Sequence, residues 1–264
     1  MMMLDLIIAT HSAEGIERVA RMVLPPREGV RYIVSWQNSG STPIPPALQR
    51  ADIDLLRTDT IGSSSNRNNA LDHSSGDIRL IVDDDLIFTA DQLESVRSTF
   101  EANPELDVAL FRYDGPDAKQ YPPVECKLPP VPKGYYITAF EMAIRNRGEA
   151  ARLRYDERFG IHGTIFTIAE EEELLYRIIK ARLDLRLFPI TITTHPGLTT
   201  GNRPMDDPRA LRARGVTISL FYPLTWPLRI PLVAWRESRK GRVRFFSMLS
   251  NGLSGAVWRF LRYH

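Results

Sequence analysis

The sequence predicts a protein of the α/β class, in which a mainly parallel sheet is flanked by helices. Apolar runs of strand length alternate with segments of helical spacing between residues 4 and 193. Two of those runs end in polar side chains, as strands do when their carboxyl ends face a ligand. A chain of 264 residues with 43% hydrophobic and 25% charged residues can bury a full core.

The first half of the chain supplies most of the regular elements. In the first helix Ile16, Val19, Ala20 and Val23 share one face, and Pro25-Pro26 ends it. We expect strands over Leu4–Thr10, Val30–Trp36, Ile53–Arg57 and Ile78–Val82, and helices over Ala13–Val23, Asn66–His73 and Gln92–Ala102. Strands joined through helices favour parallel pairing with right-handed crossovers.

The second half is less regular. We expect a strand over Val108–Tyr113, a helix over Glu170–Ala181 and a strand over Leu185–Thr193. Between the first two lies a proline-rich segment, Asp114–Gly134, for which we predict a long loop or an irregular crossing segment.

The chain ends in a segment of different charge. From Thr217 onward eight basic residues stand against Glu237 alone, a net charge of +7, which leaves −5 for residues 1–216 because the whole chain carries +2. We therefore predict two parts, a main domain at 1–216 and a basic, aromatic and helical C-terminal extension at 217–264. The acidic main part argues against a nucleic-acid partner.

The sequence also bears on the compartment. The only cysteine, Cys126, excludes an internal disulfide and a thiolate metal cluster. The first ten residues lack the basic start of a signal peptide, and prolines interrupt the most apolar stretch, Leu220–Trp235. We expect a cytoplasmic protein.

Three consecutive aspartates are the most informative feature. Asp83, Asp84 and Asp85 follow a strand that we expect to be buried, where negative charge is costly unless a cation meets it. Asp83 and Asp85 can point the same way and share one divalent ion, which would carry a phosphate-bearing substrate. The alternative is that Asp85 is the N-cap of a helix that begins near Ala90.

Other polar groups offer both a chemical and a structural interpretation. One of Glu170, Glu171, Glu172 and Glu173 could act as a general base, or all could simply favour the start of a helix. Arg67, among asparagines at an expected helix start, could contact a diphosphate or lie on the surface. His195, just beyond a strand, could be a third metal ligand or a structural residue. The phosphate-loop, dinucleotide and nucleophile-elbow motifs are absent.

These pieces, in this order, resemble the family-2-type inverting glycosyltransferases that use nucleotide sugars. The resemblance rests on five segments that run from about Met3 to Thr200: Ile7-Ile8-Ala9-Thr10-His11, Asn66-Arg67-Asn68-Asn69-Ala70-Leu71, Leu80 to Asp85, Tyr155 to Gly160 followed by Glu170 to Arg177, and His195-Pro196-Gly197. It implies the A-type fold of that family, a Rossmann-like sheet flanked by helices.

The resemblance also implies roles for single residues. Asp83 and Asp85 would hold Mn²⁺ or Mg²⁺ against the diphosphate of the donor, and Asp84 would lie near its ribose or sugar. Further donor contacts would come from Thr10, His11, Asp59, Arg67 and Asn68, with UDP the expected nucleotide. With Leu174 and Arg177 in register the base is Glu171, and a shift of one residue would select Glu170 or Glu172. The family's acidic base-binding residues after the second strand are replaced here by Trp36-Gln37-Asn38-Ser39.

We therefore expect a metal-dependent inverting glycosyltransferase that acts on a hydroxyl of a glycan or lipid-linked acceptor. The alternatives are a sugar-phosphate nucleotidyltransferase and a non-catalytic sugar-nucleotide-binding protein. The extension, in which aromatic and basic residues alternate, suits the headgroup layer of an anionic membrane, which would make the protein peripheral on its inner face. The other interpretation of the extension is a helical subdomain whose aromatics pack on the core.

Overall fold

The computed structural model describes residues 1–132, 135–197 and 207–263, which form two compact units. Unit 1 comprises Met1–Ile61, Ser65–Arg154 and Arg177–Thr199, and unit 2 comprises Gly62–Ser64, Tyr155–Tyr176 and Thr200–His264.

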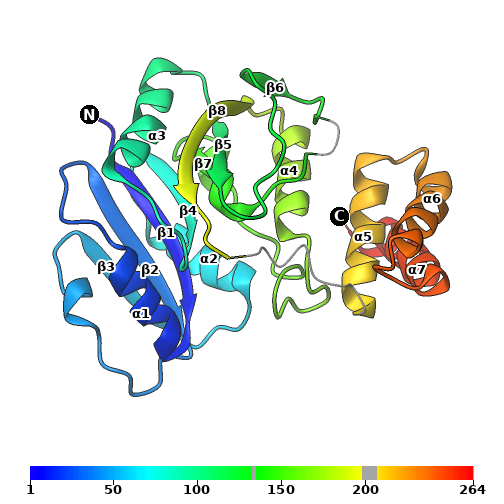
Figure 1. Cartoon of the computed structure of the whole chain (residues 1–264), viewed down its shortest axis with the longest axis horizontal. Coiled ribbons are helices and arrows are strands. Elements are labelled where there is room, and N and C mark those ends of the chain that lie inside the picture. The colour runs from blue at the N-terminus through cyan, green and yellow to red at the C-terminus, as the bar shows by residue number, and fades with distance from the viewer. Residues whose placement is uncertain (133–134, 198–206, 264) are drawn as a thin grey trace. The chain divides into compact units, whose positions relative to one another are not determined.

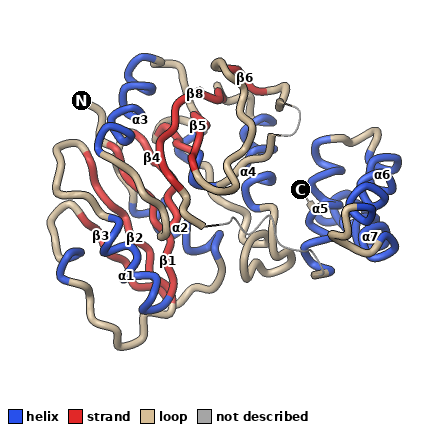
Figure 2. The backbone as a smooth tube through the Cα atoms, viewed as in Figure 1, coloured by secondary structure: helices blue, strands red, loops and turns tan. Residues whose placement is uncertain are grey.

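Unit 1 is built on a sheet of eight strands in the order β3-β2-β1-β4-β7-β5-β8-β6 (Figures 1 and 2). The strands are β1 (Leu4–His11), β2 (Val30–Gln37), β3 (Ile53–Thr58), β4 (Ile78–Asp83), β5 (Val108–Asp114), β6 (Cys126–Leu128), β7 (Met142–Arg145) and β8 (Leu185–Thr194). β1 to β4 are mutually parallel, as are β5 and β8, whereas β7 and β6 pair antiparallel to their neighbours. The expected α/β class is confirmed.

Two helices of unit 1, α1 (Ser12–Met22) and α3 (Ala90–Ala102), cover its sheet because their apolar faces pack on its apolar strands. The chain also has α2 (Ser63–His73), α4 (Glu170–Lys180) and 3-10 turns at Pro46–Leu48, Ala139–Glu141 and Ala150–Arg152. Ile16 and Val19 of α1 and Val96 and Phe100 of α3 are fully buried in one cluster with side chains of β1 and β2. These two helices therefore cover the same face of the sheet.

Two local predictions need correction. The N-cap of α3 is Thr89, which forms a capping box with Gln92, so Asp85 does not cap this helix. Helix α2 begins at Ser63 rather than Asn66, which moves Arg67 from the helix start into the second turn. Ser63, Ser64 and Ser65 therefore belong to the helix.

Two strands were not predicted from the sequence. β7, with four residues, inserts between β4 and β5, and β6, with three, adds an edge strand within the segment predicted as a long loop. Runs this short carry no periodicity that distinguishes a strand from a loop, and proline surrounds β6.

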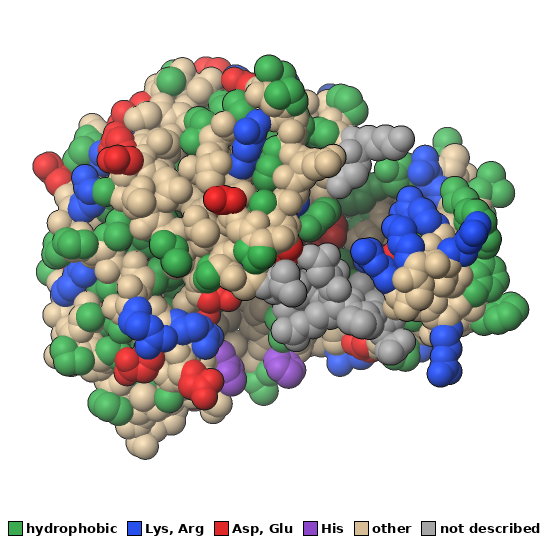
Figure 3. Space-filling model, in the orientation of Figure 1, with side chains coloured by type: hydrophobic (Ala, Val, Ile, Leu, Met, Phe, Trp, Pro, Cys, Tyr) green, Lys and Arg blue, Asp and Glu red, His purple; other side chains and the backbone are tan. Residues whose placement is uncertain are grey.

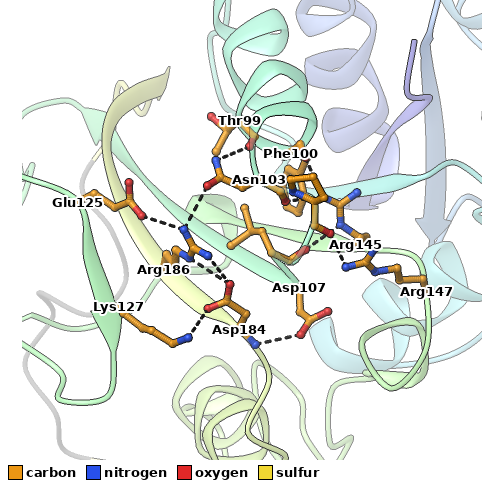
Figure 4. Close-up of polar contacts among 12 residues, drawn as sticks. Thr99, Phe100, Asn103, Asp107, Glu125, Lys127, Arg145, Arg147, Asp184 and Arg186 are labelled. Carbon is orange, nitrogen blue, oxygen red and sulfur yellow. Dashed lines mark hydrogen bonds and ion pairs between the residues drawn. The ribbon is translucent and has the colours of Figure 1, made fainter.

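A polar network fastens β6 to the amino-terminal end of β8 (Figure 4). Arg186 contacts Asp184 at 2.6 Å, Asn103 at 3.1 Å and Glu125 at 3.3 Å, and Lys127 contacts Asp184 at 2.9 Å. The hydrogen bond from Arg186 lowers the pKa of Asp184, with burial opposing it and Lys127 adding to it. The network joins α3, β6 and β8.

Unit 2 contains the three C-terminal helices, as expected: α5 (Pro208–Phe221), α6 (Trp226–Arg239) and α7 (Phe245–Arg262). Glycines let α5 and α7 touch, because a Cβ at Gly215 would lie 2.0 Å from the Gly252 carbonyl oxygen and one at Gly255 would lie 2.0 Å from that of Arg212. Helix α5 runs across residue 216, where the sequence predicted a domain boundary. The division into domains at that residue stays a prediction. Within the described ranges no helix is long and apolar enough to cross a membrane.

Candidate active site

The carboxyl ends of β1 and β4 lie side by side, with Ala9 paired in register to Asp83. Asp84 follows at once, and its carboxylate accepts hydrogen bonds from the Thr10 hydroxyl and from Arg18, whose Nε and Nη2 each lie 3.0 Å from a carboxylate oxygen. Thr10 is 2% exposed, so this contact is internal. Asp84 thus ties the tip of β4 to the tip of β1 and to α1.

The carboxylate of Asp84 is costly to place here. Burial raises its pKa above the ordinary value, and the Thr10 hydroxyl and the charge of Arg18 oppose that rise. The bidentate guanidinium geometry is the strongest pairing available to a carboxylate. Asp84, predicted to lie near the donor's ribose or sugar, is therefore already engaged by side chains of unit 1.

Gly15 makes this contact possible. It lies in the first turn of α1, and a Cβ there would stand 2.3 Å from Thr10 Oγ1 and 2.9 Å from Asp84 Oδ2. Both neighbours are fixed by their hydrogen bond, so neither can give way cheaply. The sequence carried a signal for this position, because an isolated glycine in an otherwise amphipathic helix has a packing or functional reason.

The junction between β1 and α1 is held in an uncommon conformation. Ser12 has a backbone φ of 65°, a value that residues other than glycine rarely adopt. Its carbonyl accepts a 2.8 Å hydrogen bond from Nε1 of the fully buried Trp36. Such strain, held by surrounding structure, is found at functional sites.

Helix α2 supports the same strand tips. Asn66 donates a 2.9 Å hydrogen bond to the carbonyl of Thr10, and Nη2 of Arg67 lies 3.0 Å from Asp83 Oδ1. Arg67 is 8% exposed and Asp83 is half-buried. The predicted donor contact Arg67 and the predicted ligand Asp83 are therefore partners of each other.

Asp85 faces His195. Their nearest atoms, Oδ2 and Nε2, are 3.5 Å apart, and the Asp85 side chain is 47% exposed while that of His195 is 7% exposed. Two backbone hydrogen bonds between Ile87 and Thr194, of 2.8 and 2.9 Å, hold the two segments together. The structure thus brings together residues 110 positions apart, as their two strand-tip locations predicted.

The ring of His195 is fixed on several sides. Its Nδ1 lies 2.8 Å from the Gly197 carbonyl oxygen, so Nδ1 carries the proton and Nε2 presents its lone pair toward Asp85 in the neutral ring. The Phe140 ring stacks on it, with centroids 5.3 Å apart and planes at 6°, and Tyr113 meets it edge-on. A histidine oriented in this way suits a ligand more than a mobile surface group.

A buried ion pair lies behind Phe140. Lys119, in the proline-rich segment, pairs with Glu141, and their side chains are 3% and 0% exposed. The Lys119 ammonium lies 4.3 Å from the Tyr136 ring centroid and 5.2 Å from that of Tyr135. Glu141 also accepts a 2.6 Å hydrogen bond from Tyr121, which anchors the segment predicted as a loop.

The three predicted metal ligands do not form one cluster. Over the residues that the structure describes, no three His, Cys, Asp or Glu side chains are grouped so that they could hold a metal ion. Asp83 turns to Arg67, whereas Asp85 and His195 face each other. Two of the three predicted ligands are therefore adjacent.

The other predicted donor contacts surround the tips of β1 and β3. His11 ends β1 and is exposed, Asp59 follows β3 and is exposed, and Asn68 is buried in α2. Gln37, at the end of β2, is 5% exposed and donates a 3.0 Å hydrogen bond to the Thr60 hydroxyl. Gln37 and Thr60 were not predicted as donor contacts, because a single neutral polar residue at a strand end has no charge that would mark it in the sequence.

The four glutamates of α4 lie in unit 2 and differ in exposure. Glu170 is 6% exposed and accepts a 3.2 Å hydrogen bond from Ser63, and Glu173 is fully buried and accepts one from the Tyr263 hydroxyl. Glu171 and Glu172 are half-buried. Ala169, just before them, has φ 77°, so this helix also begins at an uncommon backbone conformation.

Comparison with known proteins decides the family. The model of glycosyl transferase family 2 matches residues 13–170, which is more than half of the chain and includes Arg67 and the three aspartates Asp83 to Asp85. The chain belongs to this family. It is therefore a glycosyltransferase, and the expected family is confirmed. The family match ends at Glu170, one residue before Glu171. No curated protein matches the chain.

Solved structures agree on the family-2 fold. The chain is similar to TarS 1–349 of S. aureus in complex with UDP (TM-score 0.58, 16% identity, covering 83% of this chain and 66% of that one). It is similar to TarS 1–349 alone (0.55, 16%) and in complex with UDP-GlcNAc (0.54, 14%), each covering 100% of this chain and 76% of that one. At such identities the likeness shows the fold, which is the expected A-type glycosyltransferase fold.

Proposed function

We propose that this glycosyltransferase moves a sugar from a nucleoside-diphosphate donor to a hydroxyl of a glycan or lipid-linked acceptor, with a divalent ion and with inversion of the anomeric centre. The observation that carries the proposal is the pair Asp85 and His195 at the carboxyl edge of the sheet, where ligands bind in folds of this kind.

The pair fits Mn²⁺ or Mg²⁺. A carboxylate and a neutral imidazole are both suitable ligands, and the 3.5 Å between their atoms is close to the about 3 Å that separates adjacent donors around such an ion. Ions of this type commonly take one or two protein ligands and complete their shell with substrate phosphates and water. When bound, the ion would neutralise charge on the leaving diphosphate.

The donor is best assigned to the UDP class. This rests on the complexes of TarS with UDP and UDP-GlcNAc, since the fold is shared. In this chain Asp83 with Arg67 at one strand tip, and Gln37, Thr60 and Asp59 at the tips of β2 and β3, would contact the nucleoside. His11 and Asn68 stay predicted donor contacts.

For the catalytic base we propose Glu171. Glu171 is the residue that the family's motif selects when Leu174 and Arg177 are in register, and it lies half-buried in the first turn of α4. The acceptor oxygen would form its bond to the anomeric carbon as the bond from that carbon to the diphosphate oxygen breaks. The bonding pair leaves with the nucleoside diphosphate, and the hydroxyl proton passes to the Glu171 carboxylate.

The experiment that tests this function is thermal unfolding with UDP, GDP, dTDP and CMP, each with Mn²⁺ or with EDTA. A ligand that binds only the folded chain raises the Tm. At a concentration of a hundred times its Kd, it adds about 2.7 kcal/mol to the free energy of unfolding. We expect one nucleotide, UDP, to raise the Tm and only with Mn²⁺. No shift with any nucleotide would contradict the proposal.

The family match favours this function over nucleotidyl transfer. The cytoplasmic location stays a prediction.

A further inference from the structure

Helix α6 and the turn before it present a row of exposed apolar side chains. Leu224, Leu228, Leu232 and Trp235, which we call the α6 ridge, are 91%, 77%, 59% and 50% exposed. Leu224 lies in the turn just before α6, and the other three, spaced by four and three residues, share one face of the helix. Ile230 and Ala234 on the opposite face are fully buried. The helix is therefore fixed by one apolar face and leaves a second one in water.

Helix α7 repeats this arrangement. Phe246, Leu253, Val257, Phe260 and Leu261 are between 36% and 78% exposed, while Met248 and Ala256 on the other side are buried. The ring of Trp226 at the start of α6 lies 5.9 Å from that of Phe260, so the two helices are neighbours at this end. Figure 3 shows apolar side chains gathered over this region with basic ones among them. Exposed apolar surface of this extent marks an interaction site.

Cations accompany the apolar residues. Arg229 lies over the Tyr222 ring at 3.7 Å, Arg259 over Phe260 at 4.4 Å and Arg239 over Trp235 at 5.2 Å. From residue 226 to 262 the sequence holds eight basic residues and one acid, Glu237. Glu237 is buried and pairs with Arg236, Lys240 and Arg242, so it adds no exposed negative charge.

We propose that the α6 ridge and the adjacent face of α7 bind the surface of an anionic membrane. Leucine and aromatic side chains would enter the boundary between headgroups and acyl chains, and the arginine heads, whose stems cover apolar surface, would meet lipid phosphates. The helices lie on the membrane and do not cross it, since α6 and α7 are among the helices too short or too polar to span.

The charge of this face decides between a membrane and a second copy of the chain. Two copies that joined through it would bring two sets of arginines together with one buried acid each, which costs free energy. A surface of anionic lipid neutralises the same cations. The proposal is independent of the transfer reaction, because it concerns residues outside the site described above.

The test is flotation of the whole chain with vesicles of phosphatidylcholine alone and with added phosphatidylglycerol, in low and high salt. We expect binding to the anionic vesicles only, and its loss in high salt. Leu228→Glu combined with Leu232→Glu should weaken binding by more than about tenfold. Arg229→Gln should weaken it about fivefold, the effect of about 1 kcal/mol per cation.

Val124→Glu is the matched control, because Val124 is 66% exposed in unit 1 and its replacement should leave binding unchanged. All three variants should keep the wild-type Tm and circular dichroism, which separates loss of binding from loss of folding. Equal flotation with and without anionic lipid would overturn the proposal. So would a concentration-dependent dimer that Leu228→Glu with Leu232→Glu abolishes in the absence of lipid.

Discussion

The hydroxyl of Thr10 donates a hydrogen bond to the carboxylate of Asp84, although 74 residues separate them in the chain. The contact forms because β1 and β4 are adjacent parallel strands that end at the same level. It places one carboxylate of three inside the protein and leaves its neighbours, Asp83 and Asp85, to other partners. Asp84 therefore holds the strand ends together, whereas Asp83 and Asp85 face Arg67 and His195 at the candidate site.

Gly15→Ala should disturb this contact directly. Because the added methyl would stand 2.3 Å from Thr10 Oγ1, we expect a loss of about 1–3 kcal/mol in the free energy of unfolding, together with weaker nucleotide binding. Urea unfolding and UDP titration measure the two effects. Glu17→Ala, on the exposed side of the same helix, should change neither. An unaltered Gly15→Ala protein would contradict the close approach.

Replacing the proposed base should separate chemistry from binding. Glu171→Gln keeps the side chain's size and removes its ability to take a proton, so we expect kcat to fall by about 10²–10⁴ with the Kd for UDP unchanged. Glu170→Gln and Glu172→Gln serve as the comparison, since Glu170 is buried against Ser63. If Glu172→Gln gives the large loss in kcat and Glu171→Gln does not, the base is one residue further along α4.

Asp184→Asn should lower stability in a way that depends on pH. The folded pKa of Asp184 lies below its unfolded value of 3.8. Its contribution to the free energy of unfolding is therefore fully present above pH 3.8 and is lost as the pH falls through the folded pKa. We expect a deficit of about 1.5–3 kcal/mol at pH 7 that shrinks below about pH 3.8. Thermal unfolding followed by circular dichroism between pH 7 and 3 measures it.

The control for Asp184 is Asp54→Asn, because Asp54 is half exposed and 3.8 Å from its arginine partner. A surface pair of this kind contributes about 0–1 kcal/mol. A deficit for Asp184→Asn that stays constant down to pH 3 would contradict the assigned role of Arg186 and Lys127.

The buried pair of Lys119 and Glu141 should show strong coupling. Lys119→Met leaves a buried carboxylate without its cation and should cost about 3–5 kcal/mol, whereas Lys119→Met with Glu141→Met removes both charges and should cost less than the sum of the single changes. Urea unfolding of the two single variants and the double variant closes the cycle. Additive losses would show that the two side chains act independently.

The sequence predicted the parallel strands well for a physical reason. Long apolar runs such as Ile78–Val82 are buried on both faces of a parallel sheet, so their pattern and their burial agree. The three-residue β6 and four-residue β7 had no such pattern, since their pairing is decided by neighbours far away in the chain. The position of α2 was missed because serine favours helix starts as well as turns.

The parts of the site that could be predicted are those where charged or titratable residues follow the ends of strands. Asp85 and His195 could be expected together because both follow strand ends, and the structure places them 3.5 Å apart. The pairing of Asp84 with Arg18 could not be predicted, because it depends on which side of a strand end each of three identical residues points. Exposure likewise separates Glu171 and Glu172 from the buried Glu170 and Glu173, although the sequence makes all four alike.

The most direct test of the account is calorimetric titration of UDP into the wild-type chain and into Asp85→Asn, with Mn²⁺ and with EDTA. We predict that the wild type binds UDP only with Mn²⁺ and that Asp85→Asn, which keeps the wild-type Tm, loses most of this binding. Binding of UDP that is equally strong in EDTA, or unchanged in Asp85→Asn, would contradict the claim that Asp85 and His195 hold the ion.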